Sequence, residues 1–152
     1  MEITMHSTES ALQTLFMNTI SGLKTSMKNI MKEKQLSLSP MYFMILKNIH
    51  DTQDCTANYL ADVTEKDKGQ ITRLVQELIN QSLVTKMPNP MDKRSQFLKL
   101  TPHGRQCYQE LASADQAVLK DMRANISDEE LKHFLTIGEK MLSNLNTINH
   151  KA

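Results

Sequence analysis

Three consecutive charged residues, Asp92, Lys93 and Arg94, follow a proline-punctuated loop and precede a strand-like run. Guanidinium and ammonium groups donate hydrogen bonds to phosphate oxygens, so Lys93 and Arg94 predict a contact with a polyanion. A carboxylate repels the same anion. Asp92 is therefore expected to accept hydrogen bonds from the loop backbone or from Arg94, which would hold the guanidinium group in a fixed orientation.

A second group of polar side chains lies in the segment DKGQITRLVQELINQS, which starts at Asp67. Its apolar residues recur at the spacing of one helical face, and Lys68, Gln70, Thr72 and Arg73 fall outside that face. Arginine, lysine and glutamine carry donors suited to the edges of guanine and adenine. Gln70 has a competing role, because it stands where a capping box with Asp67 would need it. Thr72 suits a phosphate better than a base.

The charge along the chain is uneven, although the whole chain carries only +1. Residues 64–105 contain eight Lys or Arg and four Asp or Glu, a net charge of +4, and the rest of the chain carries −3. A basic central segment favours a polyanion-binding face at that place. A merely solvated charged face is the alternative that charge alone leaves open.

Helical periodicity and capping residues predict a mainly α fold with a small β-hairpin wing. The expected helices cover residues 8–34, the segment PMYFMILKNIHD after Ser39, and residues 56–63, 67–82, 102–125 and 128 onwards. Thr101 with Pro102, and Ser127 with Glu130, provide the start signals of the last two helices. Between residues 83 and 100 the apolar period changes to two, which predicts a hairpin with a long polar tip.

This order of elements is typical of a winged helix-turn-helix domain. In such a domain the recognition helix, here residues 67–82, enters the major groove, and its N-terminal side chains reach base edges. The basic wing, residues 83–100, lies along flanking phosphates or enters the minor groove, where the negative potential is strongest. Winged helices also serve as protein-interaction modules, so the order alone leaves a module without a DNA site as an alternative.

The run from CTANYLADVTEKDKGQITRLVQELINQSLV through TKMPNPMDKRSQFLKLTPHGR resembles the MarR family of bacterial transcriptional regulators. The family pattern has a wing of Asp-x-Arg type, then a strand and Leu-Thr-x-x-Gly. The matching positions here are Asp92, Arg94, Leu100, Thr101 and Gly104. Two departures concern the helix end and the first wing strand: Ser82 stands where the family usually has Gly, and Lys86 where Arg is frequent.

The resemblance implies an obligate homodimer that represses nearby genes and is often released by a small phenolic or amphipathic effector. It implies a helical dimerisation region in residues 1–36 and 102–152, and a winged helix-turn-helix DNA-binding domain in residues 37–101. Broad apolar stripes on the terminal helices also favour a dimer. A twofold dimer would bind an inverted repeat in double-stranded DNA with half-sites about 10 bp apart.

Methionines and aromatic residues of the first two helices form a candidate effector pocket. Methionine adapts its shape to varied apolar ligands. Ordinary core and dimer packing is the alternative explanation. The residues concerned are Phe16, Met17, Met41, Tyr42 and Met44.

Cys55 and Cys107 stand 52 positions apart with no CxxC motif and no adjacent His, so their spacing supports no zinc site. Inert thiols are expected, and a thiol-based redox sensor on the same scaffold is the alternative. No Ser-His-Asp, Cys-His or paired-carboxylate arrangement is visible, so neither catalysis nor a cofactor is expected. The chain lacks a membrane-length apolar run and a secretory signal, which makes the cytoplasm the expected location.

Overall fold

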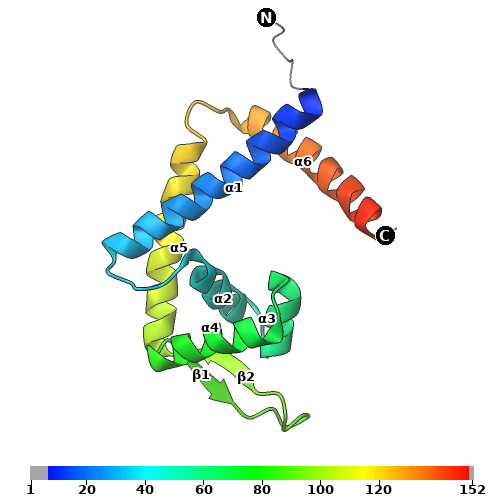
Figure 1. The fold of residues 1–152 in the computed structure, drawn as a ribbon. Coiled ribbons are helices and arrows are strands. Elements are labelled where there is room, and N and C mark those ends of the chain that lie inside the picture. Colours follow the sequence, from blue (N-terminus) through cyan, green and yellow to red (C-terminus); the bar gives the residue numbers. More distant parts are fainter. Residues whose placement is uncertain (1–6, 151–152) are drawn as a thin grey trace, which may run out of the picture. The chain divides into compact units, whose positions relative to one another are not determined.

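The computed structural model describes residues 7–150 in two compact units, which meet between Ala117 and Val118. The first unit contains a bundle of helices and one hairpin, and the second contains the end of one helix and the whole of the next (Figure 1). The elements are α1 (Thr8–Glu33), α2 (Pro40–Asp51), α3 (Ala57–Thr64), α4 (Lys68–Asn80), β1 (Val84–Met87), β2 (Phe97–Leu100), α5 (Pro102–Met122) and α6 (Asp128–Asn149). The predicted fold class is confirmed.

The core of the first unit draws at least one fully buried side chain from each of its five helices. Each buried Leu, Ile or Met stabilises the fold by about 1.5 to 3 kcal/mol relative to exposure, so no helix is dispensable. The fully buried residues include Met31, Ile45, Leu46, Leu60, Ile71, Leu78, Leu83 and Leu111.

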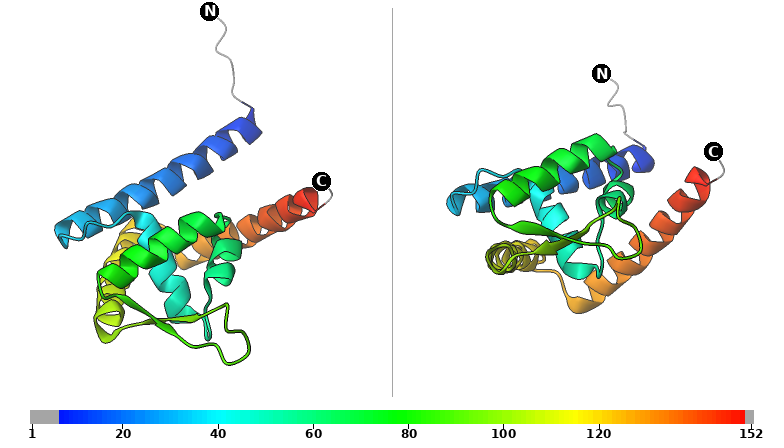
Figure 2. Two further views of the ribbon diagram at one scale, coloured as in Figure 1. Left: turned by 60° about the horizontal axis from the view of Figure 1, so that its bottom comes forward. Right: turned by 90° about the horizontal axis from the view of Figure 1, so that it is seen from below.

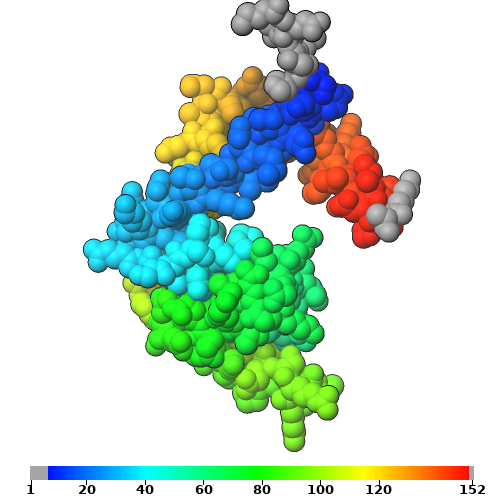
Figure 3. Space-filling model, viewed as in Figure 1, coloured from blue at the N-terminus to red at the C-terminus, as the bar shows by residue number. Residues whose placement is uncertain are grey.

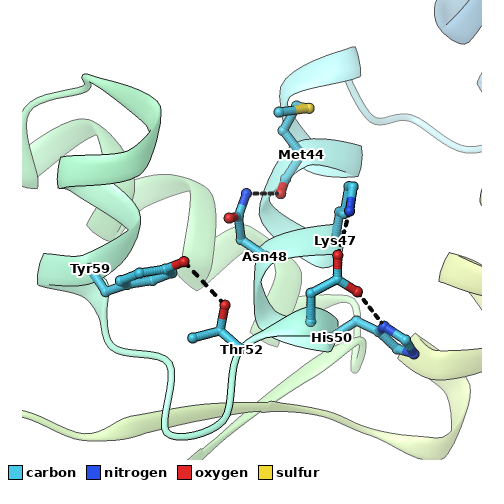
Figure 4. A network of polar contacts seen from close by, with 7 residues as sticks. Met44, Lys47, Asn48, His50, Thr52 and Tyr59 are labelled. Carbon is cyan, nitrogen blue, oxygen red and sulfur yellow. Dashed lines mark hydrogen bonds and ion pairs between the residues drawn. The ribbon is translucent and has the colours of Figure 1, made fainter. Parts of the chain in front are cut away.

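Polar contacts at the end of α2 fix the turn that leads into α3 (Figure 4). Asp51 accepts a hydrogen bond from Lys47 and pairs with His50, whose Nδ1 lies 2.8 Å from Asp51 Oδ1. The bond with His50, followed by that with Lys47, lowers the pKa of the Asp51 carboxyl. The Thr52 hydroxyl donates to the Tyr59 hydroxyl at 3.3 Å and so connects α2 with α3.

Three helices of the first unit end on a non-glycine residue in the left-handed conformation. These residues are Gln35, Glu65 and Ser82, with φ of 55°, 53° and 59°. At the end of α4, the Leu83 N–H donates to the Leu78 carbonyl at 2.9 Å, which is the longer bond of a Schellman motif. The sequence predicts that α4 closes without a left-handed glycine. In the structure, Ser82 ends α4 in the left-handed conformation that a glycine would adopt at this position.

The hairpin returns the chain to the start of α5. β1 and β2 pair antiparallel, with Val84 opposite Leu100. The Thr101 hydroxyl donates to the Ser82 carbonyl at 2.6 Å and accepts from the Gly104 N–H at 2.9 Å. A Cβ atom at Gly104 would lie 1.8 Å from the Leu83 carbonyl oxygen, so only glycine fits there. The Leu-Thr-x-x-Gly pattern thus joins the wing to α5.

Several predicted boundaries differ from the observed ones by a few residues. The first helix ends at Glu33, α3 continues to Thr64, and α4 occupies residues 68–80 of the expected 67–82. α5 ends at Met122 rather than near Asn125, because the N–H groups of Arg123 and Ala124 donate to carbonyls three residues back rather than four. Ser39 stands at the N-cap of α2, but its side chain makes no capping hydrogen bond.

In the second unit, the expected capping box opens α6. The Ser127 hydroxyl accepts from the Glu130 N–H at 3.1 Å, and Glu130 Oε2 accepts from the Ser127 N–H at 2.8 Å. None of the residues of α6 is buried. Its exposed apolar side chains are Phe134, Leu135, Ile137, Met141, Leu142, Leu145 and Ile148. Within residues 7–150, no helix has the length and apolarity to traverse a membrane.

Candidate DNA-binding surface

The fourth helix presents a polar face outward because its apolar face is anchored in the core. Ile71, Val75 and Leu78 are buried. Lys68, Thr72 and Arg73 are exposed on the other side, where the sequence pattern predicted them. In Figure 2, α4 lies along the hairpin within the first unit, so the two predicted DNA-contacting elements are neighbours.

The N-terminus of α4 is capped by only half of the expected capping box. Asp67 Oδ1 accepts from the Gln70 N–H at 2.8 Å. The described residues contain no return bond from the Gln70 side chain, which is half-buried. Since capping does not occupy the Gln70 amide, its donors and its oxygen can serve another partner.

Two other side chains of this face already have neighbours of their own. The Thr72 hydroxyl donates to the Lys68 carbonyl at 2.8 Å, so a phosphate would have to compete for its proton. Tyr42 of α2 lies near Arg73 and Glu77. Burial, and then the Glu77 carboxylate, raise the pKa of Tyr42, while Arg73 opposes them. The charges of Arg73 and Glu77 therefore both act on Tyr42, next to the outward side of α4.

The tip of the wing is shaped by side chains that accept hydrogen bonds from its backbone. Asp92 Oδ1 accepts from the Arg94 N–H at 2.9 Å, and the Asp92 carbonyl accepts from the Ser95 N–H at 3.2 Å. The carboxylate therefore bonds the Arg94 main chain, and the residues described contain no ion pair between the two side chains. Lys93 and Arg94 are both exposed. The hairpin turn projects from the unit (Figure 3).

A cavity of about 180 Å³ connects the wing with α4. Thr72 of the helix and Arg94 of the wing both line it, so the structure brings residues of the two predicted contact groups to one place. The sequence pattern did not predict Asn58 and Lys86 as parts of this surface. Lys86 had two signals, its place in the basic segment of residues 64–105 and its departure from the family pattern, but no contact was assigned to it. The lining residues are Ala57, Asn58, Thr72, Val75, Lys86, Arg94, Ser95, Gln96 and Leu98.

Comparison with known proteins finds similarity to one family of regulators. A family model described as MarR family matches residues 36–95, which include α2, α3, α4 and most of the wing. The HTH-type transcriptional regulator YdgJ of Bacillus subtilis is 24% identical over 68% of this chain and 63% of its own length, and MarR of Salmonella typhimurium is 29% identical over 70% and 75%. Over these residues the chain is similar to the MarR family of regulators. It spans slightly less than two thirds of YdgJ.

Solved MarR structures have the same fold. MarR of Staphylococcus aureus in complex with salicylate and kanamycin has a TM-score of 0.81 at 19% identity, covering 91% of this chain and 93% of that one. A mutant MarR from E. coli complexed with operator DNA has a TM-score of 0.75 at 22% identity, covering 87% and 94%. At these identities the likeness shows the winged fold of the MarR family.

The predicted effector residues keep contact with solvent. Phe16, Met17 and Met44 are exposed, and Met41 and Tyr42 are half-buried. The cavity of about 400 Å³ on α1 is lined by Ala11, Thr14, Leu15 and Asn18 rather than by these five residues. The effector pocket stays a prediction.

Both thiols are buried in the first unit. Cys55 is fully inaccessible, and burial raises its pKa to about 11. Burial, and then the Glu110 carboxylate, also raise the pKa of Cys107. A raised pKa suppresses the thiolate, which is the form that oxidants attack. Residues 7–150 contain no cluster of three or more His, Cys, Asp or Glu that could hold a metal ion.

Proposed function

We propose that this protein is a sequence-specific DNA-binding transcriptional regulator. The observation that carries the proposal is the exposed polar face of α4 beside a wing whose tip exposes two cations. A helix of this kind fits the major groove, and a cationic wing fits the adjacent phosphates and minor groove. The E. coli MarR mutant is complexed with operator DNA, and the relatives are named as regulators, which supports the same role here.

The proposed contacts divide into base readers and phosphate binders. Lys68, Gln70 and Arg73 face the major groove, and the Gln70 amide is available because it takes no part in capping. Thr72 and Lys93 contact phosphates. Arg94 enters the minor groove, and Asp92 sets the backbone from which it extends. Phosphate contacts position the protein, while base contacts select the sequence.

The functional form is proposed to be a homodimer that binds an inverted repeat. The exposed apolar side chains of α6 and of the N-terminal half of α1 need cover that each unit lacks by itself. A second copy supplies that cover and doubles the DNA-binding surface. Binding of a symmetric dimer next to a promoter excludes polymerase, so repression is the simplest outcome, and the cytoplasm is the place where such DNA lies.

A small aromatic or amphipathic effector is proposed to release the operator. The salicylate bound in the S. aureus MarR complex is a ligand of this chemistry. In this chain the predicted site is Phe16, Met17, Met41, Tyr42 and Met44. Titration of the operator complex with salicylate tests it. Met41→Gln and Met44→Gln variants should need more salicylate than the wild type to release the operator. Equal salicylate dependence in the wild type and both variants would reject the pocket.

The experiment that tests the main proposal is selection of genomic fragments by the purified protein, followed by binding curves across a salt series. Specific fragments should bind at least about a thousandfold more tightly than random duplexes at the same salt. Affinity that never distinguishes sequences would reject the regulator and favour the protein-interaction module. Peroxide treatment should leave operator affinity unchanged, since both thiols are buried with raised pKa values, and a loss of affinity that Cys55→Ser prevents would favour the thiol sensor.

A further inference from the structure

The wing tip carries an apolar side chain that the contacts described so far do not use. Met91 is 92% exposed, whereas the most exposed apolar side chains of α1 and α6, Met17 and Ile148, are 62% and 63% exposed. Those helices expose apolar surface for a second copy of the chain. Met91 lies instead in the turn between β1 and β2, immediately before Asp92, Lys93 and Arg94.

The backbone around Met91 is held in one conformation by its neighbours. Asn89 Oδ1 accepts from the Met91 N–H at 3.0 Å, and Asp92 Oδ1 accepts from the Arg94 N–H at 2.9 Å. Pro90 fixes its own φ and restricts the residue before it. The tip is thus ordered before any ligand arrives. When Met91 binds a ligand, little backbone entropy is lost, and the main entropic cost is the ordering of the Met91 side chain itself.

The ligand that fits this combination is the minor groove of duplex DNA. Lys93 and Arg94 bring the tip to the strongest negative potential, and proteins that read this groove often insert an apolar side chain between base steps. An anionic membrane would also accept an apolar side chain beside cations, but the wing lies beside the exposed polar face of α4, which fits the major groove of DNA rather than a lipid surface.

We propose that Met91 is an apolar wedge that enters the minor groove beside Arg94 and partly unstacks one base step. The inference rests on the proposed DNA-binding function. Pyrimidine–purine steps unstack most easily, so Met91 selects such a step under each wing without a hydrogen bond to any base. Met91 is then a specificity-determining residue that acts through DNA deformability.

Substitutions at Met91 separate the wedge from the charges next to it. Met91→Leu keeps an apolar side chain of similar size, and Met91→Gln replaces it with a polar one of similar length. Neither substitution changes a charge, so the slope of log affinity against log salt should stay that of the wild type. Arg94→Ala should lower the slope by about 1, because one phosphate-region cation is lost.

The experiment uses the full-length protein and an operator chosen from its bound genomic fragments, with 2-aminopurine placed at the step under the wing. Wild type and Met91→Leu should raise the probe's fluorescence on binding, since unstacking removes its quenching. Met91→Gln should bind about fivefold more weakly and leave the fluorescence low, because the apolar burial is lost.

Each result has a separate meaning. Equal affinity and fluorescence in wild type and Met91→Gln would overturn the wedge while leaving DNA binding intact. Weaker binding of Met91→Gln with a fluorescence rise equal to that of the wild type would also overturn it, since the base step would then unstack without the apolar side chain. A wild type without sequence-selective binding would reject the proposed function, and the wedge with it. Thermal unfolding of each variant at one protein concentration checks that the fold is retained.

Discussion

At the residue scale, the polar groups divide into those proposed to face DNA and those that shape the surface. Asp92 belongs to the second kind, because its carboxylate bonds the backbone N–H of Arg94 at 2.9 Å rather than the guanidinium group. The guanidinium therefore keeps all its donors for a ligand. Thr72 has its proton engaged by the Lys68 carbonyl and makes a weaker contact than a free hydroxyl would.

Arg94→Ala is predicted to weaken operator binding by about 1 to 3 kcal/mol, the usual loss for a good contact to nucleic acid. Fluorescence anisotropy with labelled operator measures the change. Arg105→Ala is the matched control, because it removes the same charge from an exposed position at the start of α5. Wild-type affinity in Arg94→Ala, or an equal loss in Arg105→Ala, would contradict the assignment of the wing tip.

The buried Cys55 thiol is predicted to react only when the protein unfolds. Its pKa of about 11 is raised from an ordinary value near 9, so at pH 8 its thiolate population is about 100-fold lower than that of a free thiol. Iodoacetamide labelling of a Cys107→Ser variant, followed by mass spectrometry, measures the rate with and without urea. Fast labelling of the native protein would contradict this.

The same raised pKa gives a pH dependence of stability. Above about pH 9 the unfolded chain loses the thiol proton while the folded chain retains it, until pH passes the folded value of about 11. The unfolded state then binds fewer protons, so the contribution of this thiol is complete below pH 9 and falls between pH 9 and 11. Urea unfolding of wild type and Cys55→Ala over this range should show a steeper decline for the wild type.

At the element scale, hydrogen bonds at both ends of α4, the proposed recognition helix, determine where the helix begins and ends. Asp67 caps its start, and Ser82 closes its end at a φ of 59° while its carbonyl accepts from the Thr101 hydroxyl. The end of α4 is thereby connected to the start of α5. The first and last residues of the wing therefore lie at the same junction. Gly104 completes this junction because nothing larger fits against Leu83.

Ser82→Gly is predicted to stabilise the protein by about 0.5 kcal/mol. The left-handed conformation costs a non-glycine residue about 1 kcal/mol, and the larger unfolded-state entropy of glycine offsets part of the gain. Urea unfolding at fixed protein concentration measures it. Ser113→Gly, the same change inside α5, should instead destabilise by about 0.5 kcal/mol. A loss of stability in both variants would show that Ser82 is unstrained.

At the scale of the whole molecule, charge and apolar surface are separated along the chain. The basic segment of residues 64–105 holds α4 and the wing, while the terminal helices expose large apolar side chains. One surface therefore suits a polyanion and the other suits a second copy of the chain. DNA affinity should depend on dimer formation, because a dimer that binds two linked half-sites has a higher overall affinity than a monomer that binds one.

Leu142→Glu is predicted to dissociate the proposed homodimer. Leu142 is 58% exposed on α6, and a carboxylate placed in an apolar interface costs about 3 kcal/mol, or more than about 100-fold in the dissociation constant. Analytical ultracentrifugation measures the oligomeric state, and Lys140→Glu, which adds a carboxylate elsewhere on α6, is the control. A Leu142→Glu protein that stays dimeric would remove α6 from the interface.

Local patterns in the chain were enough to predict the elements, the cap at Ser127 and the outward face of α4, because apolar periodicity and capping involve residues close in sequence. They placed Lys68, Thr72 and Arg73 outside the apolar stripe and Arg94 at a hairpin tip. Gln70 was ambiguous, since a spacing cannot tell whether a side chain returns its bond to the cap. The tertiary structure was needed to show that Thr72, Lys86 and Arg94 share one cavity, that Ser82 takes the glycine conformation, and that both thiols are buried. Each of those facts depends on contacts between residues far apart in sequence, which no local pattern encodes.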